Sequence, residues 1–163
     1  MSSYIIWTMK SVIIYDSQFG NTKIIAQTIF ESLKTKTTAR LVQASTATLN
    51  DLQGVKIIVI GSPTQGGRPT TGIHSFLDKI PPGFLKGKKV AAFDTRFDKN
   101  KVNFLIQLLI QKFDYAAPKI SDAMVAKGGQ LATPPQGFFV QGKSGPLVLG
   151  EEARTQIWAN QLI

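Results

Sequence analysis

The sequence predicts an α/β fold in which a five-stranded parallel sheet lies between two layers of helices. Short apolar segments alternate with segments of helical periodicity along most of the 163 residues. This alternation is typical of parallel strands joined by crossover helices that cover both faces of the sheet. Three polar turns follow three of the expected strands. The strand order 2-1-3-4-5 would bring these turns to one edge, where ligands bind in open α/β sheets.

The first half of the chain contains three expected strands. Val12–Tyr15 is a continuous apolar run, and a helical pattern begins near Lys23. Ala39–Val42 is a weaker strand, and Thr48–Gln53 has room for one or two helical turns. Val55–Ile60 is the strongest strand, because five of its six residues are β-branched aliphatics.

The second half continues the alternation after a turn rich in Gly and Pro. Apolar residues at helical spacing over 73–80 predict a helix, and Lys89–Phe93 predicts the fourth strand. Pro118 suits the first turn of the next helix, where its missing N–H has no cost. Gln130–Thr133 and Gly137–Val140 are expected to form two pieces of the fifth strand, divided by two prolines.

The turn Ser17–Thr22, between the first strand and the first helix, predicts an anion site. The first amides of a helix have no intrahelical partners, and the helix dipole favours negative charge there. The side chains of Ser17, Asn21 and Thr22 add hydrogen-bond donors, and Gly20 permits close approach of the backbone.

Composition excludes several functions. There is no cysteine, so thiolate catalysis, disulfides and Cys-ligated metals are excluded, and His74 is the one histidine. No apolar run approaches the roughly 18 residues of a membrane span, and residues 1–8 lack the features of a signal peptide. We therefore expect a cytoplasmic protein without a membrane partner, with residues 1–8 as an extension of a domain over residues 9–163.

The net charge of +9 constrains partners more than fold. Most of the excess lies between Gly61 and Gln130. No basic motif interleaved with aromatic residues accompanies it, so we expect no nucleic-acid partner.

Five segments, in this order, carry a resemblance to a known family: SVIIYDSQFGNT, VIGSPTQGGRPT, AAFDTRF, GGQLATPPQGFFV and GPLVLGEEARTQIWA. They resemble flavodoxins and flavodoxin-like FMN proteins over almost the whole chain from Met9. The first segment is similar to the phosphate loop of that family, (T/S)-x-(T/S)-G-x-T. The resemblance implies a flavodoxin-like three-layer sandwich that binds FMN non-covalently.

The resemblance also implies which residues contact FMN. The phosphate would be wrapped by Ser17, Gln18, Phe19, Gly20, Asn21 and Thr22. The ribityl chain and one side of the ring would be contacted by Ser62, Pro63, Thr64, Gln65 and Gly66. The third loop would be formed by Asp94, Thr95, Arg96 and Phe97. No catalytic or metal-ligating residue is implied.

The chain departs from the family pattern in two ways. Gln65 stands where flavodoxins often have an aromatic residue, which leaves Phe97 as the nearby candidate to stack on the ring. Electron-carrying flavodoxins are usually acidic, whereas this chain is basic and has Arg96 near the expected ring. We therefore expect a less negative potential for the fully reduced flavin, and an acidic redox partner.

The segment 102–113 resembles an insertion and is apolar nearly all round if it is helical. Such a segment would be an extra core helix, a lid over the flavin or a homodimer contact. We predict self-association through it.

The leading function is electron transfer by a bound FMN, with the flavin supplying the chemistry. The alternatives are an FMN-dependent NAD(P)H:quinone-type reductase and a flavin-free interaction domain. The segment 137–144 matches the P-loop pattern, but Gly145-Pro146 follows where a helix would have to begin.

Overall fold

The structure is a computed structural model that describes residues 9–101, 103–105, 107–108 and 114–163. Its strands are β1 (Lys10–Tyr15), β2 (Thr38–Gln43), β3 (Ile57–Pro63), β4 (Lys89–Phe97), β5 (Gln130–Leu131) and β6 (Gln136–Val140). They pair in parallel in the order β2-β1-β3-β4-β5, and β6 also pairs with β4. The predicted parallel sheet and strand order are confirmed, with β6 as an additional strand.

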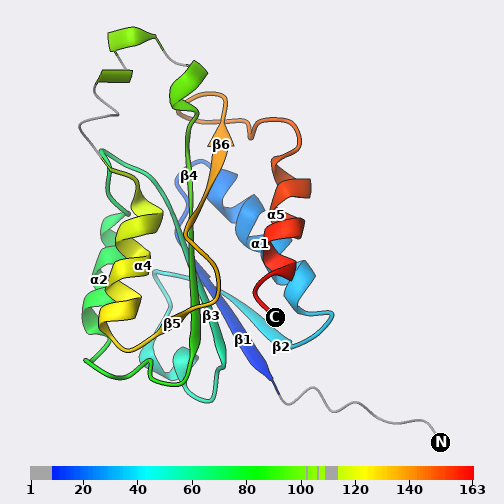
Figure 1. Cartoon of the computed structure of the whole chain (residues 1–163), viewed down its shortest axis with the longest axis vertical. Helices are drawn as coiled ribbons and strands as arrows, with labels where there is room; N and C mark the ends of the chain where they lie inside the picture. The colour runs from blue at the N-terminus through cyan, green and yellow to red at the C-terminus, as the bar shows by residue number, and fades with distance from the viewer. Residues whose placement is uncertain (1–8, 102, 106, 109–113) are drawn as a thin grey trace, which may run out of the picture.

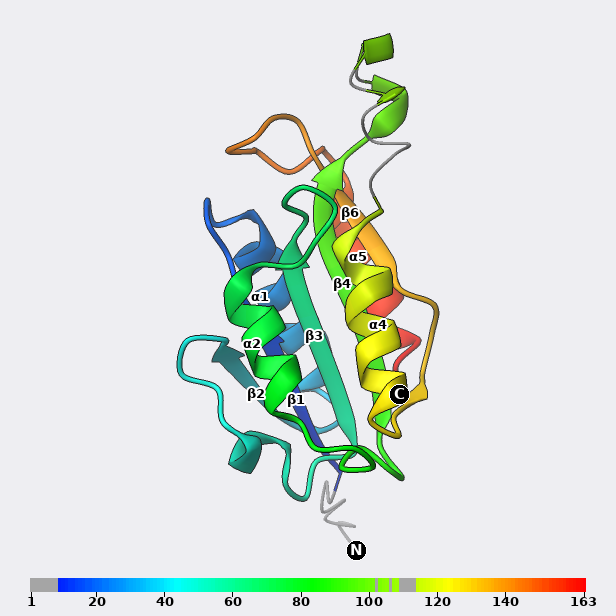
Figure 2. The same ribbon diagram turned by 90° about the vertical axis from the view of Figure 1, so that its left-hand side faces the viewer.

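Both β5 and β6 lie on the same side of β4. β5 pairs with the beginning of β4 at Lys89–Val90, and β6 pairs with its end at Phe93–Phe97. Pro134 and Pro135 lie between them, and neither has an N–H to donate to a ladder. The expected strand in two pieces is therefore present, and Figure 2 shows the second piece, β6, beside β4.

Helices cover both faces of the sheet (Figure 1). One layer contains α1 (Asn21–Leu33) and α5 (Glu151–Asn160), and the other contains α2 (Thr71–Lys79) and α4 (Ala116–Ala126). Two short 3-10 turns, η1 (Leu49–Leu52) and η2 (Lys99–Lys101), complete the described elements. None of the helices within the described residues has the length and apolar character that crossing a bilayer requires.

The central strands are buried on both faces, which explains their continuous apolar runs. In β3, Ile58 and Ile60 pack in the core beneath α2 and α4, whereas Ile57 and Val59 pack in the core beneath α1 and α5. Successive side chains of a strand point to opposite faces, so both cores receive residues from the same strand.

The two longest strands extend beyond their predicted ends. Ser62 and Pro63 belong to β3, and the predicted loop Asp94–Phe97 belongs to β4, so the sequence-based ends of these strands were wrong. The cause is pairing on both sides: Ser62 pairs with Asp94, and β6 pairs with β4 as far as Phe97. Polar residues concealed this continuation, because a strand was recognised from apolar runs.

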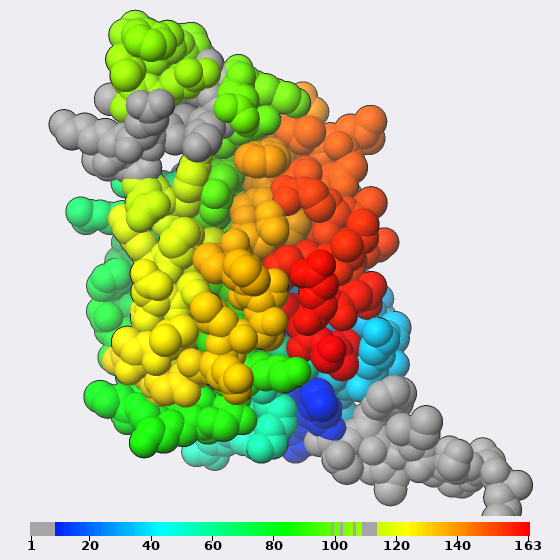
Figure 3. Space-filling model, in the orientation of Figure 1, coloured from blue at the N-terminus to red at the C-terminus, as the bar shows by residue number. Residues whose placement is uncertain are grey.

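The insertion is described only in part. Phe104 and Leu105 are each 71% exposed, so these two side chains do not belong to the core. Figure 3 shows the described part of the segment that follows β4, in green, at one end of the molecule. Residues 102, 106 and 109–113 of the insertion, and the proposed extension over residues 1–8, lie outside the described residues.

Candidate cofactor site

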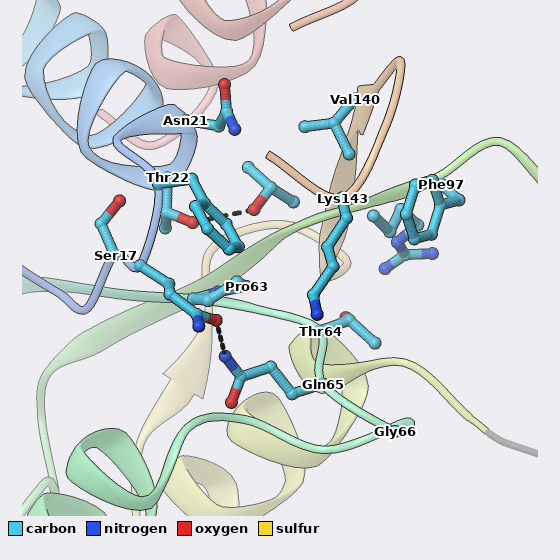
Figure 4. A pocket seen from close by; sticks show the side chains of 14 residues that line it. Ser17, Asn21, Thr22, Pro63, Thr64, Gln65, Gly66, Phe97, Val140 and Lys143 are labelled. Carbon is cyan, nitrogen blue, oxygen red and sulfur yellow. Dashed lines mark hydrogen bonds between the residues drawn. The ribbon is translucent and has the colours of Figure 1, made fainter. Parts of the chain in front are cut away.

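A cavity of about 570 Å³ lies where β1, β3 and β4 end (Figure 4). Its volume falls within the range of sites that bind small molecules. It is lined by Ser17, Gln18, Phe19, Asn21, Thr22, Pro63, Thr64, Gln65, Gly66, Thr95, Arg96, Phe97, Val140 and Lys143.

Most of the residues predicted to contact a cofactor line this one cavity. Three of them, Gly20, Ser62 and Asp94, do not. Ser62 and Asp94 are completely buried, so they shape the strand ends from within. Val140 and Lys143 line the cavity although the sequence pattern did not single them out.

The first loop is organised by the Ser17 hydroxyl. Its oxygen accepts hydrogen bonds from the amides of Gly20 (3.1 Å) and Lys23 (3.3 Å). Gly20 has a φ of 94°, in the left-handed region that favours glycine, directly before α1 begins. The amides of Asn21 and Thr22, in the first turn of α1, have no carbonyl within the helix to bond, and the dipole makes this end positive. The loop is therefore formed as an anion-binding turn.

Side chains connect the first loop to its neighbours. The hydroxyl oxygens of Thr22 and Thr95 lie 2.8 Å apart, which joins the start of α1 to β4. On the exposed side, the Gln65 amide nitrogen donates to the side-chain oxygen of Gln18 over 2.7 Å (Figure 4). Gln65, which stands where an aromatic residue was expected, thus links the first and second loops.

The second loop contains a tight turn. Gln65 and Arg68 form a β-bridge through two backbone hydrogen bonds of 2.9 and 3.1 Å. The two residues between them, Gly66 and Gly67, have φ values of 55° and 76°. A two-residue hairpin turn of type I′ requires positive φ at both central positions, which explains the glycine pair.

Helix α4 holds this turn in place. The Ala116 amide donates to the Thr64 hydroxyl over 3.0 Å, and the Lys119 ammonium donates to the carbonyl oxygen of Gly67 over 2.8 Å. Both ends of the turn are therefore fixed to a buried element, and its backbone is preorganised towards the cavity.

A buried ion pair forms the wall at the end of β4. Asp94 is completely buried and accepts two hydrogen bonds from Arg96, at 2.5 Å from Nε and 2.7 Å from the terminal nitrogen. The Ala117 amide, at the start of α4, donates to the same carboxylate over 2.8 Å. Arg96 lines the cavity as expected, and the Asp94 carboxylate offsets its charge there.

Flat contacts hold the Arg96 guanidinium from both sides. Its central carbon lies 3.7 Å from the centre of the Tyr115 ring. A Cβ atom added to Gly137 would lie 2.2 Å from the Arg96 Nε, so only glycine fits at this position of β6. Burial raises the pKa of the Tyr115 phenol, and the Arg96 charge offsets only part of this effect.

Lys143 is the other cation of the cavity, and it has no such partner. Within the described residues, its ammonium group has neither an ion pair nor a hydrogen bond. Figure 4 shows the side chain directed from the segment after β6 towards Thr64. Its position soon after the last strand was the available sequence signal, because the segment after a parallel strand lies at the ligand-binding edge.

Known proteins are similar to this chain in sequence pattern and in fold. Residues 12–126 match the flavodoxin domain family. The chain belongs to the flavodoxin domain family. No curated protein sequence matches the chain.

Solved flavodoxin structures have the same fold. Flavodoxin 1 of Bacillus cereus is 16% identical, with a TM-score of 0.76 over 94% of this chain and 96% of the other. Flavodoxin 2 of the same organism is 22% identical, with a TM-score of 0.74 over 94% and 97%. Rubredoxin oxygen:oxidoreductase of Desulfovibrio gigas is 18% identical, with a TM-score of 0.70 over 94% of this chain but 35% of that longer one. At such identities the likeness shows the fold.

The Asp94–Arg96 pair should be required for stability. Asp94→Ala leaves the Arg96 charge, whose side chain is only 16% exposed, without its partner. We expect the free energy of unfolding, measured in urea, to fall by about 3–5 kcal/mol. The control is Asp122→Ala at an exposed position of α4, where we expect a change within about 0.5 kcal/mol. Equal losses in the two variants would contradict this role.

Proposed function

We propose that this flavodoxin domain holds one FMN non-covalently in the cavity and carries electrons between partner proteins. The observation that carries the proposal is that an anion-binding helix N-terminus, a fixed glycine turn and the end of β4 all line one cavity. Membership of the flavodoxin domain family supports it, because members of this family generally bind flavin. When bound, the flavin supplies the electron-transfer chemistry.

The first loop would hold the phosphate. The Ser17 oxygen accepts two amide hydrogens, so its own hydroxyl hydrogen is available for a ligand oxygen. The amides of Asn21 and Thr22 are available for the same reason that all first-turn amides are. No lysine is required at such a turn, because backbone donors and the helix dipole supply the attraction.

The ring would be held by the second loop and the end of β4. Phe19 and Phe97 both line the cavity, and they are 47% and 39% exposed. Aromatic surface for a flat ring is therefore available from two sides, although the sequence pattern singled out only Phe97 for stacking. The backbone groups of Gly66 and its neighbours would bond the edge of the ring.

The reductase alternative rests on positive charge beside the third loop. The Arg96 charge is offset by Asp94, and Lys88 and Lys89 lie at the opposite end of β4, which leaves Lys101 in η2 and Lys143 in the cavity lining as the cations that support it. Rapid NADPH oxidation by the FMN-loaded protein, without a second protein, would favour that alternative. The acidic character of the redox partner and the cytoplasmic location stay predictions.

Phosphate recognition is tested by comparing FMN with riboflavin, which has the same ring but no phosphate. When FMN is titrated into flavin-free protein, the fluorescence of FMN should be quenched until one flavin is bound per chain. The protein should bind riboflavin more weakly than FMN. Ser17→Ala should weaken FMN binding about tenfold and leave riboflavin binding nearly unchanged. Ser75→Ala, on the exposed side of α2, is the matched control. Failure to bind either flavin would end the proposal and favour a flavin-free interaction domain.

Lys143 should set the potential of the bound flavin. Its unpaired charge stabilises the anionic reduced flavin more than the neutral oxidised one, so Lys143→Gln should lower the potential of the second one-electron step. A tenfold change in relative affinity corresponds to roughly 60 mV in a redox titration. Lys56→Gln, at the other end of the sheet, removes the same charge and should leave the potential unchanged. A shift shared by both variants would contradict a local effect.

We further propose that the chain self-associates through the insertion. Phe104 and Leu105 expose apolar surface on a segment that projects from the domain. Sedimentation velocity should show association that increases with concentration and is lost when both residues are replaced by Ser. Leu149→Ser, at a residue that is 97% exposed, is the control and should associate like the original chain. A chain that stays monomeric at high concentration would refute the contact.

A further inference from the structure

Lysines gather at the end of the sheet opposite the cavity. They come from the amino ends of the central strands and from the adjoining turns and helix ends. The set, which we call the lysine pole, consists of Lys10, Lys36, Lys56, Lys79, Lys86, Lys88, Lys89 and Lys127.

Backbone hydrogen bonds place part of the lysine pole in one row. The Lys56 amide donates to the carbonyl oxygen of Lys10 over 2.9 Å, and the Lys89 amide donates to that of Lys56 over 2.8 Å. These residues therefore follow one another across neighbouring strands, which lie about 4.8 Å apart. The Lys88 ammonium is also held here, because it donates to the carbonyl oxygen of Val55 over 2.8 Å.

Helix ends and a turn extend this row. Lys79 is the last residue of α2, and Lys127 follows the last residue of α4. The Leu85 amide donates to the carbonyl oxygen of Lys127 over 3.0 Å, which brings the turn with Lys86 beside the end of α4. Figure 2 shows α2 and α4 ending beside the amino ends of β3 and β4.

Acidic side chains do not compensate this charge. Within the described residues, no member of the lysine pole forms an ion pair. Of the acids on elements near this end, Glu31 pairs with Lys34 and Asp51 with Arg40. Asp78 contacts His74, which is charged only when it is protonated. Of the remaining acids, Asp94 lies within β4 and Asp122 in the middle of α4. The others follow the carboxyl ends of strands, at Asp16, Asp98, Asp114, Glu151 and Glu152.

The lysine ammonium groups of this row repel one another, and the fold does not require lysine at these positions. Burial lowers the pKa of Lys88, and the neighbouring Lys56 charge lowers it further. The helix dipole accounts for Lys79 and Lys127, because cations are favoured at helix C-termini. It does not account for Lys10, Lys56 and Lys89, which begin strands or stand just before them. An anionic partner outside the chain would offset the repulsion among these three lysines.

We propose that the lysine pole docks the domain on the surface of an anionic lipid bilayer, with the cavity facing the aqueous side. Lysines near such a surface are attracted to its negative potential. The chain enters the domain at this pole, at Met9, and the preceding sequence contains Tyr4, Ile5, Ile6 and Trp7. Aromatic and aliphatic side chains of this kind favour the lipid–water interface, and an apolar segment together with a polybasic patch gives stable attachment.

A bilayer suits this surface better than a nucleic acid. The charges are all lysine ammonium groups, whereas phosphate recognition in nucleic acids makes frequent use of the arginine fork. The contact is peripheral and needs no membrane-spanning helix. The proposal therefore departs from the expectation of a protein without a membrane partner, and it does not depend on whether FMN is bound.

The test uses the full chain and sedimentation with lipid vesicles. The chain should bind phosphatidylcholine vesicles that contain phosphatidylglycerol and should not bind pure phosphatidylcholine vesicles. Added salt should release it, because screening shortens the range of the attraction. Absence of binding to anionic vesicles at low salt would overturn the proposal.

Two triple variants with equal charge loss locate the contact. Lys10→Gln/Lys56→Gln/Lys89→Gln should weaken vesicle binding roughly a hundredfold, at about fivefold per lysine. The control, Lys23→Gln/Arg68→Gln/Lys101→Gln, removes three exposed charges from the cavity side and should bind nearly as the original chain does. Equal weakening in both variants would overturn the proposal.

Two further measurements test the role of charge and the kind of partner. Replacing the same three pole lysines by Arg keeps their charge and should retain vesicle binding, so a loss in this variant would overturn the role of charge.

Fluorescence anisotropy with a labelled DNA duplex at the same salt concentration tests nucleic acid as the competing partner. Tight DNA binding without vesicle binding would also overturn the proposal.

Discussion

The buried ion pair of Asp94 and Arg96 joins the parts of the molecule that form one wall of the cavity. Both oxygens of the carboxylate are bonded, and the start of α4 donates to one of them. The guanidinium lies between Tyr115 and the bare backbone of Gly137. A buried charge is tolerated only when it is paired and hydrogen-bonded, so β4, β6 and α4 must meet in this one arrangement. The wall is therefore set before any ligand arrives.

This pair also affects where the positive charge of the chain is left without a partner. Lys88 and Lys89 are close to Arg96 in sequence, but Arg96 is seven residues after Lys89 along β4, at about 3.3 Å per residue. The same strand thus begins among unpaired lysines and ends in a neutral pair. Lys143, the cavity cation that has no ion-pair partner among the described residues, comes from a distant part of the chain. The net charge of +9 is therefore distributed unevenly between the two ends of the sheet.

The sequence predicts the sheet, its strand order and the loops around the cavity, because apolar periodicity and turn residues are local signals. It does not predict that Asp94–Phe97 is a strand, since the partners of that strand lie in β3 and β6. Nor does it predict that Arg96 is neutralised, which depends on burial and on the contact with Tyr115. Lys143 was missed because its approach to the cavity depends on how the segment after β6 folds back.

The division of the outer strand into β5 and β6 has a consequence for solubility. The edge of a sheet presents unpaired backbone groups that another chain can extend into a continuous ladder. Here Pro134 and Pro135 interrupt that edge, and neither offers a hydrogen to an incoming strand. The opposite edge, β2, carries the exposed side chains Thr38, Arg40 and Gln43. A sheet with such edges resists extension into fibrils even at high protein concentration.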